Sequence, residues 1–136
     1  MTFALVTGAG GFLGQYLVEQ LVAQGIRVRG FGRKEYPALE KLGVEQVRGD
    51  VQDVELLARA CQGVDVVFHT AAVAGLAGPW SHYFGINTQG TRNVIVACQK
   101  QRVQRLVYTS SPSVTFAGTE QCGVDESVPY PKKWLG

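Results

Sequence analysis

Three glycines recur at intervals of three residues directly after a short apolar run, in the segment from Thr7 to Gly14. Gly8 allows a tight turn, Gly11 lets the backbone approach a pyrophosphate with no Cβ in the way, and Gly14 lets a helix pack on the strand before it. The first N–H groups of that helix would face the phosphates. A glycine-rich turn without a ligand would use the same residues, but the strand-turn-helix context favours a dinucleotide-binding site.

A basic pair stands where an acid is common in NAD-binding sequences. About 20 residues after the glycine turn, a carboxylate normally accepts hydrogen bonds from the ribose hydroxyls. Here Gly32 occupies that place, and Arg33 and Lys34 follow it. Such cations suit a 2′-phosphate, since charge-assisted hydrogen bonds contribute about 1.5–3 kcal/mol each. The sequence therefore favours NADP over NAD as the cofactor, while two solvated cations in a loop are the simpler interpretation.

The elements that position these residues alternate between strand and helix. Apolar runs predict strands over 3–7, 26–31, 44–47, 64–69 and 105–110. Helical spacing predicts helices over 12–25, 36–42, 54–61 and 81–101. Because right-handed crossovers join the strands, we expect an α/β fold, a Rossmann-type doubly wound parallel sheet of order 3-2-1-4-5. Residues 1–116 form this domain, and 117–136 form a loop rich in turn residues.

Composition and charge exclude several classes of protein. The chain of 136 residues is 46% hydrophobic and 18% charged, an ordinary globular balance. Its 13 Lys and Arg against 11 Asp and Glu give a scattered net charge of +2, so nucleic acid is not an expected partner. No apolar run approaches the ~20 residues that a membrane span requires, and we expect a cytoplasmic protein. Cys61, Cys98 and Cys122 are expected to be buried or half-buried, with no metal site.

Five ordered motifs carry a resemblance to a known superfamily. They are Thr7-Gly8-Ala9-Gly10-Gly11-Phe12-Leu13-Gly14, Gly49-Asp50-Val51, His69-Thr70-Ala71-Ala72, Asn87-Thr88-Gln89-Gly90-Thr91-Arg92-Asn93 and Val107-Tyr108-Thr109-Ser110-Ser111. Over residues 1–116 the chain resembles the extended short-chain dehydrogenase/reductase superfamily of NAD-dependent epimerases, dehydratases and 3β-hydroxysteroid dehydrogenases. Residues 108–114 and 123–127 look most like the 3β-hydroxysteroid dehydrogenase-like branch, which includes reductases of long-chain β-keto acids.

The resemblance implies roles for individual residues. Asp50 would border the adenine, although an acid there could equally cap the next helix. Ser111 matches the family serine that hydrogen-bonds the substrate oxygen and is the expected catalytic residue. His69 is expected to be structural, and Asn87 to serve near the cofactor or in a local backbone bond. The expected cofactor-binding residues are Gly8, Gly10, Gly11, Phe12, Leu13, Gly14, Arg33, Asp50, Val51, Ala71 and Ala72.

The acid/base pair of that superfamily, Tyr-x-x-x-Lys on a helix, is not found in this sequence. That spacing places both side chains on one helix face, where the ammonium lowers the pKa of the phenol from about 10. Tyr130 has Trp134 at the lysine position, and Pro131 disfavours a helical conformation for it. In relatives a segment like 130–134 precedes the catalytic tyrosine, so the resemblance implies the amino-terminal portion of a longer enzyme. We expect the 136-residue chain alone to be inactive.

Three functions remain open at this point. The first is the NAD(P)-binding portion of an oxidoreductase that interconverts a secondary alcohol and a ketone, of the 3β-hydroxysteroid or long-chain β-hydroxy acid type. The others are a nucleotide-sugar epimerase or dehydratase, and a non-catalytic dinucleotide-binding module. The expected partners are a dinucleotide and a small hydrophobic substrate. A homo-oligomer is also expected, because residues 105–108 would form an exposed sheet edge.

Overall fold

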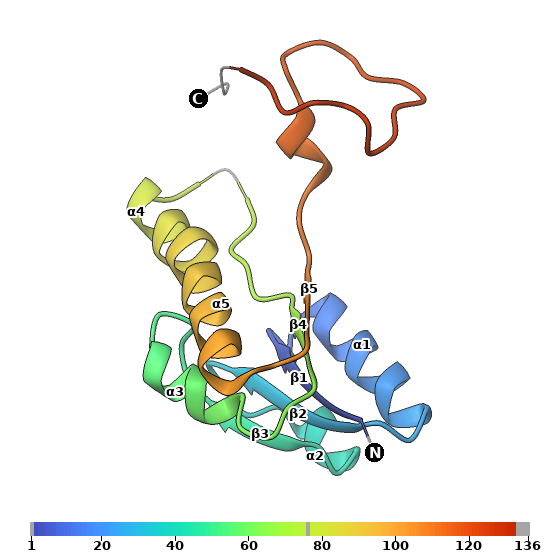
Figure 1. The fold of residues 1–136 in the computed structure, drawn as a ribbon, viewed down its shortest axis with the longest axis vertical. Helices are drawn as coiled ribbons and strands as arrows, with labels where there is room; N and C mark the ends of the chain where they lie inside the picture. The colour runs from blue at the N-terminus through green and yellow to red at the C-terminus, as the bar shows by residue number, and fades with distance from the viewer. Residues whose placement is uncertain (1, 76, 133–136) are drawn as a thin grey trace.

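The computed structural model describes residues 2–75 and 77–132, and its centre is a parallel sheet of order β3-β2-β1-β4-β5 (Figure 1). The strands are β1 (Phe3–Thr7), β2 (Arg27–Gly32), β3 (Glu45–Arg48), β4 (Val66–His69) and β5 (Arg105–Tyr108). The α-helices are α1 (Phe12–Ala23), α2 (Pro37–Lys41), α3 (Val54–Ala60), α4 (Trp80–Tyr83) and α5 (Gly90–Gln101). A π-helical segment, η1 (Phe84–Gln89), and a 3₁₀ helix, η2 (Pro112–Thr115), complete the set. The predicted fold class and strand order are confirmed.

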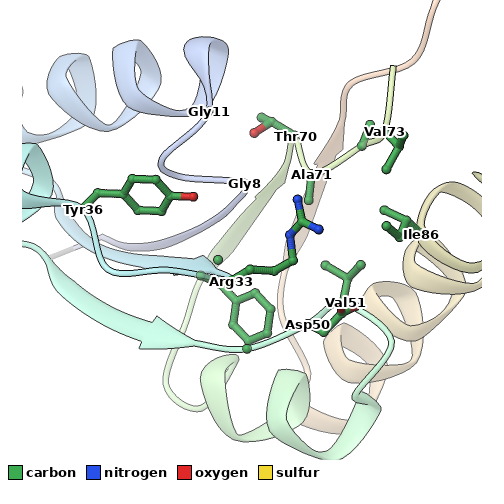
Figure 2. Close-up of a pocket in the computed structure, with 14 residues that line it drawn as sticks. Gly8, Gly11, Arg33, Tyr36, Asp50, Val51, Thr70, Ala71, Val73 and Ile86 are labelled. Carbon is green, nitrogen blue, oxygen red and sulfur yellow. The ribbon is translucent and has the colours of Figure 1, made fainter. Parts of the chain in front are cut away.

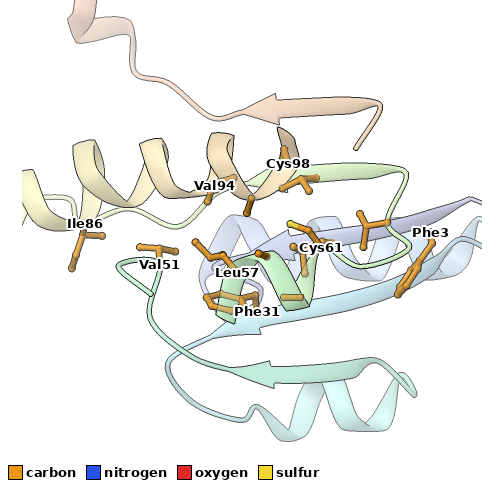
Figure 3. Packing of buried hydrophobic residues seen from close by; sticks show 14 residues of the cluster. Phe3, Phe31, Val51, Leu57, Cys61, Ile86, Val94 and Cys98 are labelled. Atoms are coloured by element: carbon orange, nitrogen blue, oxygen red, sulfur yellow. The ribbon is translucent and has the colours of Figure 1, made fainter. Parts of the chain in front are cut away.

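Strand β1 lies in the middle of the sheet, and all of its residues are buried. Successive side chains of a strand point to opposite faces. Phe3 and Leu5 therefore join the core under α3 and α5, whereas Ala4 and Val6 join the core under α1 and α2. Figure 3 shows the α3 and α5 side, where Leu57 and its neighbours fill the space between helix and sheet. Burial on both faces explains why β1 is apolar from Phe3 to Val6, and the hydroxyl of the buried Thr7 is hydrogen-bonded to His69.

The helix predicted over 81–101 is divided into α4, η1 and α5, which follow one another without a loop. The π-helical segment η1 lies between the two α-helices. At its junction with α5, the hydroxyl of Thr91 in α5 donates to the carbonyl of Asn87 in η1 at 2.6 Å. Here a side-chain hydroxyl competes with a backbone N–H for the same carbonyl, and hydrophobic spacing does not reveal such competition. The spacing therefore predicts one α-helix with no π-helical segment.

Beyond β5 the chain leaves the sheet, passes through η2 and forms a segment that stands away from the domain (Figure 1). Residues 117–132 contain no helix or strand, and Trp134 lies outside the described residues. Cys122 in this segment is exposed, which corrects the expected burial; Cys61 and Cys98 are buried as expected. In the described ranges, no helix is long and apolar enough to cross a membrane. Neither do His, Cys, Asp and Glu side chains there gather into a metal site.

Strand β5 forms one edge of the sheet, and Val107 and Tyr108 on it are 49% and 50% exposed. An uncovered edge strand with apolar side chains pairs readily with another chain. We expect the 136-residue chain to form a homo-oligomer in size-exclusion chromatography with light scattering. Val107→Lys should shift it toward the monomer, whereas Ile95→Lys, at a 40% exposed position on α5, should not. A monodisperse wild-type monomer would contradict this expectation.

Candidate functional site

A pocket opens at the carboxyl ends of β1, β2, β3 and β4 (Figure 2). Ligands of open parallel sheets bind at this edge, where the strand order reverses on the two sides of β1. The lining is made of glycines and small or apolar side chains with a few polar groups. Its residues are Gly8, Gly11, Phe31, Gly32, Arg33, Tyr36, Gly49, Asp50, Val51, Thr70, Ala71, Ala72, Val73 and Ile86.

The glycine turn forms one wall of the pocket. Gly8 has φ 69°, its N–H donates to the Phe31 carbonyl at 2.8 Å, and its carbonyl accepts from the Gly11 N–H at 2.9 Å. A Cβ on Gly8 would lie 2.8 Å from the Ala71 nitrogen, and one on Gly14 would collide with the Gly8 carbonyl. Close backbone approach thus requires glycine at both positions.

The first turn of α1 is open toward this wall. Gly11 is the N-cap of α1 and offers no side-chain hydrogen bond, and the first turn contains no acidic residue. The first N–H groups of a helix have no partner within it, and the helix dipole is positive at this end. The arrangement fits the pyrophosphate of a dinucleotide.

The structure brings most of the predicted cofactor residues together. Gly8, Gly11, Arg33, Asp50, Val51, Ala71 and Ala72 all line the pocket. Gly10, Phe12, Leu13 and Gly14 are not among the lining residues. Phe12 and Leu13 are 86% and 50% exposed, and Gly14 packs on the turn itself.

Ser111, the predicted catalytic residue, lies beyond β5 and outside the lining of the pocket. It is exposed and caps η2, where its hydroxyl oxygen accepts from the Ser113 N–H at 3.3 Å. The two serine hydroxyls also lie 2.7 Å apart. The structure therefore places Ser111 after a strand end at the same edge of the sheet, but does not join it to the pocket.

Asp50 lies in the turn after β3, where its carboxylate accepts from the Gln52 N–H at 2.9 Å. The N-cap of α3 is Asp53, whose side chain accepts from the Leu56 N–H at 2.9 Å. The alternative prediction that Asp50 caps the next helix is therefore wrong. A helix capped by Asp50 would begin at residue 51, whereas α3 begins at Val54. Asp50 instead lines the pocket.

A chain of hydrogen bonds through the buried side chain of His69 supports the residues beside the pocket. The Thr91 hydroxyl gives its proton to the Asn87 carbonyl, so it accepts from Nε2–H of His69 at 3.0 Å. Nδ1 of His69 is then unprotonated and accepts from the Thr7 hydroxyl at 2.7 Å. His69 is 1% exposed, and burial lowers its pKa to about 4. A neutral, fully bonded imidazole is structural, as the sequence predicts.

The side-chain amide of Asn87 binds the loop after β4 through both its oxygen and its nitrogen. Its oxygen accepts from the Val73 N–H at 2.8 Å, and its nitrogen donates to the Val73 carbonyl at 2.9 Å. Val73 lines the pocket, so this pair shapes the wall opposite the glycine turn. The side chain of Asn87 does bind the backbone, but at a residue 14 positions earlier in the chain and not locally as predicted.

Several lining residues are absent from the prediction, among them Tyr36, Thr70, Val73 and Ile86. Thr70 and Val73 flank the predicted Ala71 and Ala72, so their proximity on the chain was the available signal. Tyr36 and Ile86 reach the pocket through the tertiary arrangement of the β2–α2 turn and η1. No local pattern predicts such contacts.

The family model of the 3-beta hydroxysteroid dehydrogenase/isomerase family matches residues 5–136. The chain belongs to this family. It is 49% identical over 135 residues to a 2-alkyl-3-oxoalkanoate reductase of Shewanella oneidensis, covering 99% of this chain and 35% of that protein. It is 42% identical over 135 residues to a 3 beta-hydroxysteroid dehydrogenase/Delta 5-->4-isomerase of Mycobacterium tuberculosis, covering 93% and 36%. The chain thus spans about a third of the length of these relatives.

Solved structures of extended short-chain dehydrogenases resemble the fold closely. A UDP-glucose-4-epimerase from Stenotrophomonas with bound NAD has a TM-score of 0.84 and 27% identity, over 96% of this chain and 43% of that one. A short-chain dehydrogenase/reductase superfamily protein from Agrobacterium tumefaciens with bound NAD has a TM-score of 0.81 and 33% identity, over 96% and 40%. The fold of this chain thus resembles that of proteins whose structures contain bound NAD.

The neutral His69 makes folding stability depend on pH. Its folded pKa of about 4 lies below the ordinary 6.5, so its contribution is complete above pH 6.5 and is lost as the pH falls toward 4. The loss amounts to up to about 3 kcal/mol. Urea unfolding at several pH values should show this dependence in the wild type and in His82→Gln, whose histidine is exposed. His69→Gln should show a shallower dependence, and an unchanged slope would contradict the assignment.

Proposed function

We propose that this chain is the NAD(P)-binding portion of an oxidoreductase that interconverts a secondary alcohol and a ketone by hydride transfer. The observation that carries the proposal is the open N-terminus of α1, presented by the glycine turn to a pocket that four strand ends share. A substrate of the 3β-hydroxysteroid or long-chain β-hydroxy acid type is supported by the relatives, one a 2-alkyl-3-oxoalkanoate reductase and one a 3 beta-hydroxysteroid dehydrogenase.

The geometry of Arg33 supports NADP as the preferred cofactor. Figure 2 shows its side chain reaching from the end of β2 into the pocket. Arg33 forms no ion pair with any residue in the described ranges. A guanidinium without a carboxylate partner is available to bind a 2′-phosphate in a bidentate manner.

Ser111 is proposed to hydrogen-bond the substrate oxygen as hydride moves to or from the nicotinamide. Its hydroxyl can steady a carbonyl or an alkoxide, but it does not supply the proton. Tyr130 lacks a lysine four residues later, so the sequence provides no Tyr-x-x-x-Lys pair for that step. Within this chain, the proposed work is to bind and orient the dinucleotide.

A nucleotide-sugar epimerase or dehydratase is the second candidate. It is favoured by the similarity to the UDP-glucose-4-epimerase, whose TM-score is 0.84. An enzyme of that kind returns the hydride to its substrate and keeps its NAD, so retention of unexchangeable NAD would select it. A non-catalytic dinucleotide-binding module, the third candidate, would bind cofactor without supporting turnover in any longer form. In each case the proposed location is the cytoplasm.

Replacing Arg33 tests the cofactor preference. Arg33→Ala removes one charge-assisted contact to the 2′-phosphate, so affinity for NADPH should fall roughly 10- to 150-fold. Affinity for NADH should stay nearly constant, and Arg59→Ala, which removes an exposed cation of α3, should change neither value. Isothermal titration calorimetry measures both constants. Equal losses for the two cofactors would contradict the assignment of Arg33 to the 2′-phosphate.

The purified 136-residue chain should bind NADPH without turnover. NADPH fluorescence provides the binding control, and NADPH absorbance in the presence of a long-chain β-keto acid or a 3-ketosteroid measures the reaction. We expect no substrate-dependent oxidation of NADPH, because the proton donor is absent. Sustained reduction by this chain alone would overturn the prediction.

A further inference from the structure

The turn between β2 and α2 is held at both ends by β3 and the residue that follows it. At the first end, the Gly32 carbonyl accepts from the Gly49 N–H at 2.8 Å. At the other end, the side-chain amide of Gln46 binds both backbone groups of Tyr36. Its Oε1 accepts from the Tyr36 N–H at 2.8 Å, and its Nε2 donates to the Tyr36 carbonyl at 3.2 Å. The side chain of Gln46 thus satisfies both backbone groups of Tyr36, as the backbone of a neighbouring strand would.

The side chain of Tyr36 connects this turn to the glycine turn. Tyr36 is half-buried and lines the pocket, and Figure 2 shows its hydroxyl directed toward the glycine turn. Its ring occupies the space where a Cβ on Gly10 would stand. A side chain at position 10 would therefore displace the tyrosine ring. A displacement of Tyr36 would loosen both walls of the pocket together.

Between these anchors, residues 33–35 are exposed and form no ion pair within the part of the chain that the structure describes. Among the described residues, no ion pair or side-chain hydrogen bond fixes Arg33, so we infer that its position depends on the two anchored ends of the turn. A turn that is already ordered loses less conformational entropy when a ligand binds. Such ordering favours a contact that requires a fixed geometry, such as a bidentate contact to phosphate.

We propose that Gln46 is a positioning residue that holds the Arg33–Tyr36 turn ready for an adenosine with a 2′-phosphate and thereby determines discrimination between NADP and NAD. The inference rests on the proposed function, because it assigns the adenosine end of the cofactor to this pocket. Gln46 itself touches no ligand and acts through the backbone of Tyr36. Its loss should weaken recognition of the 2′-phosphate more than binding of the rest of the nucleotide.

The test compares 2′,5′-ADP with 5′-AMP, which differ only in the 2′-phosphate, by isothermal titration calorimetry on the whole chain. The wild type should prefer 2′,5′-ADP by roughly tenfold or more. Gln46→Leu removes both hydrogen bonds at similar side-chain size, and the preference should fall by about three- to tenfold while 5′-AMP affinity changes little. Gln99→Leu, at an exposed position on α5, is the matched control and should keep the wild-type preference.

Gln46→Glu is the second variant and serves if circular dichroism shows Gln46→Leu to be unfolded. A carboxylate still accepts from the Tyr36 N–H but no longer donates to its carbonyl, so this variant should also lose preference. A lower melting temperature with an unchanged preference would make Gln46 merely structural and overturn the inference. A wild type that binds both nucleotides equally would overturn it and leave dinucleotide binding intact. A wild type that binds neither would overturn the proposed function as well.

Discussion

Three backbone segments meet at the end of β1 with no side chain between them. The Gly8 Cα faces the backbone of Ala71, and the Gly8 carbonyl faces Gly14. Hydrophobic packing on both sides of the sheet brings these segments close, and glycine lets them touch. Thr7, one residue earlier, joins this junction to His69 through a buried hydrogen bond. This junction places the glycine turn directly beside the residues after β4, and both line the pocket.

The arginines of β2 and the arginine that directly follows it have different surroundings. Arg27 and Arg29 both pair with Glu45 at the start of β3, and their guanidinium carbons lie 4.1 and 4.8 Å from the ring centre of Phe3. These cations lie toward the amino ends of β2 and β3 and do not line the pocket. Arg33 has no such pairing in the described ranges and lies beside the open end of α1. The pocket is thus suited to an anion although the chain carries little net charge.

Much of the fold follows from the sequence because its signals are local. The strand order comes from the alternation of apolar runs and amphipathic segments, and Gly8 and Gly11 mark the pocket because a close turn has few chemical solutions. The role of Tyr36 was not predictable, since its contacts depend on how the β2–α2 turn crosses the glycine turn. The π-helical segment and the two hydrogen bonds from Gln46 to Tyr36 were not predictable for a related reason. Side-chain hydrogen bonds to backbone groups leave hydrophobic periodicity unchanged.

We propose that a dinucleotide binds at the glycine turn with its adenosine end between Arg33 and Asp50. Backbone amide chemical-shift mapping by NMR, with NADPH added to the isotope-labelled chain, tests this claim most directly. We expect a saturable change concentrated at Gly8, Gly11, Arg33 and Ala71, with little change at the far ends of the strands. No saturable change, or one centred away from the carboxyl edge of the sheet, would contradict it.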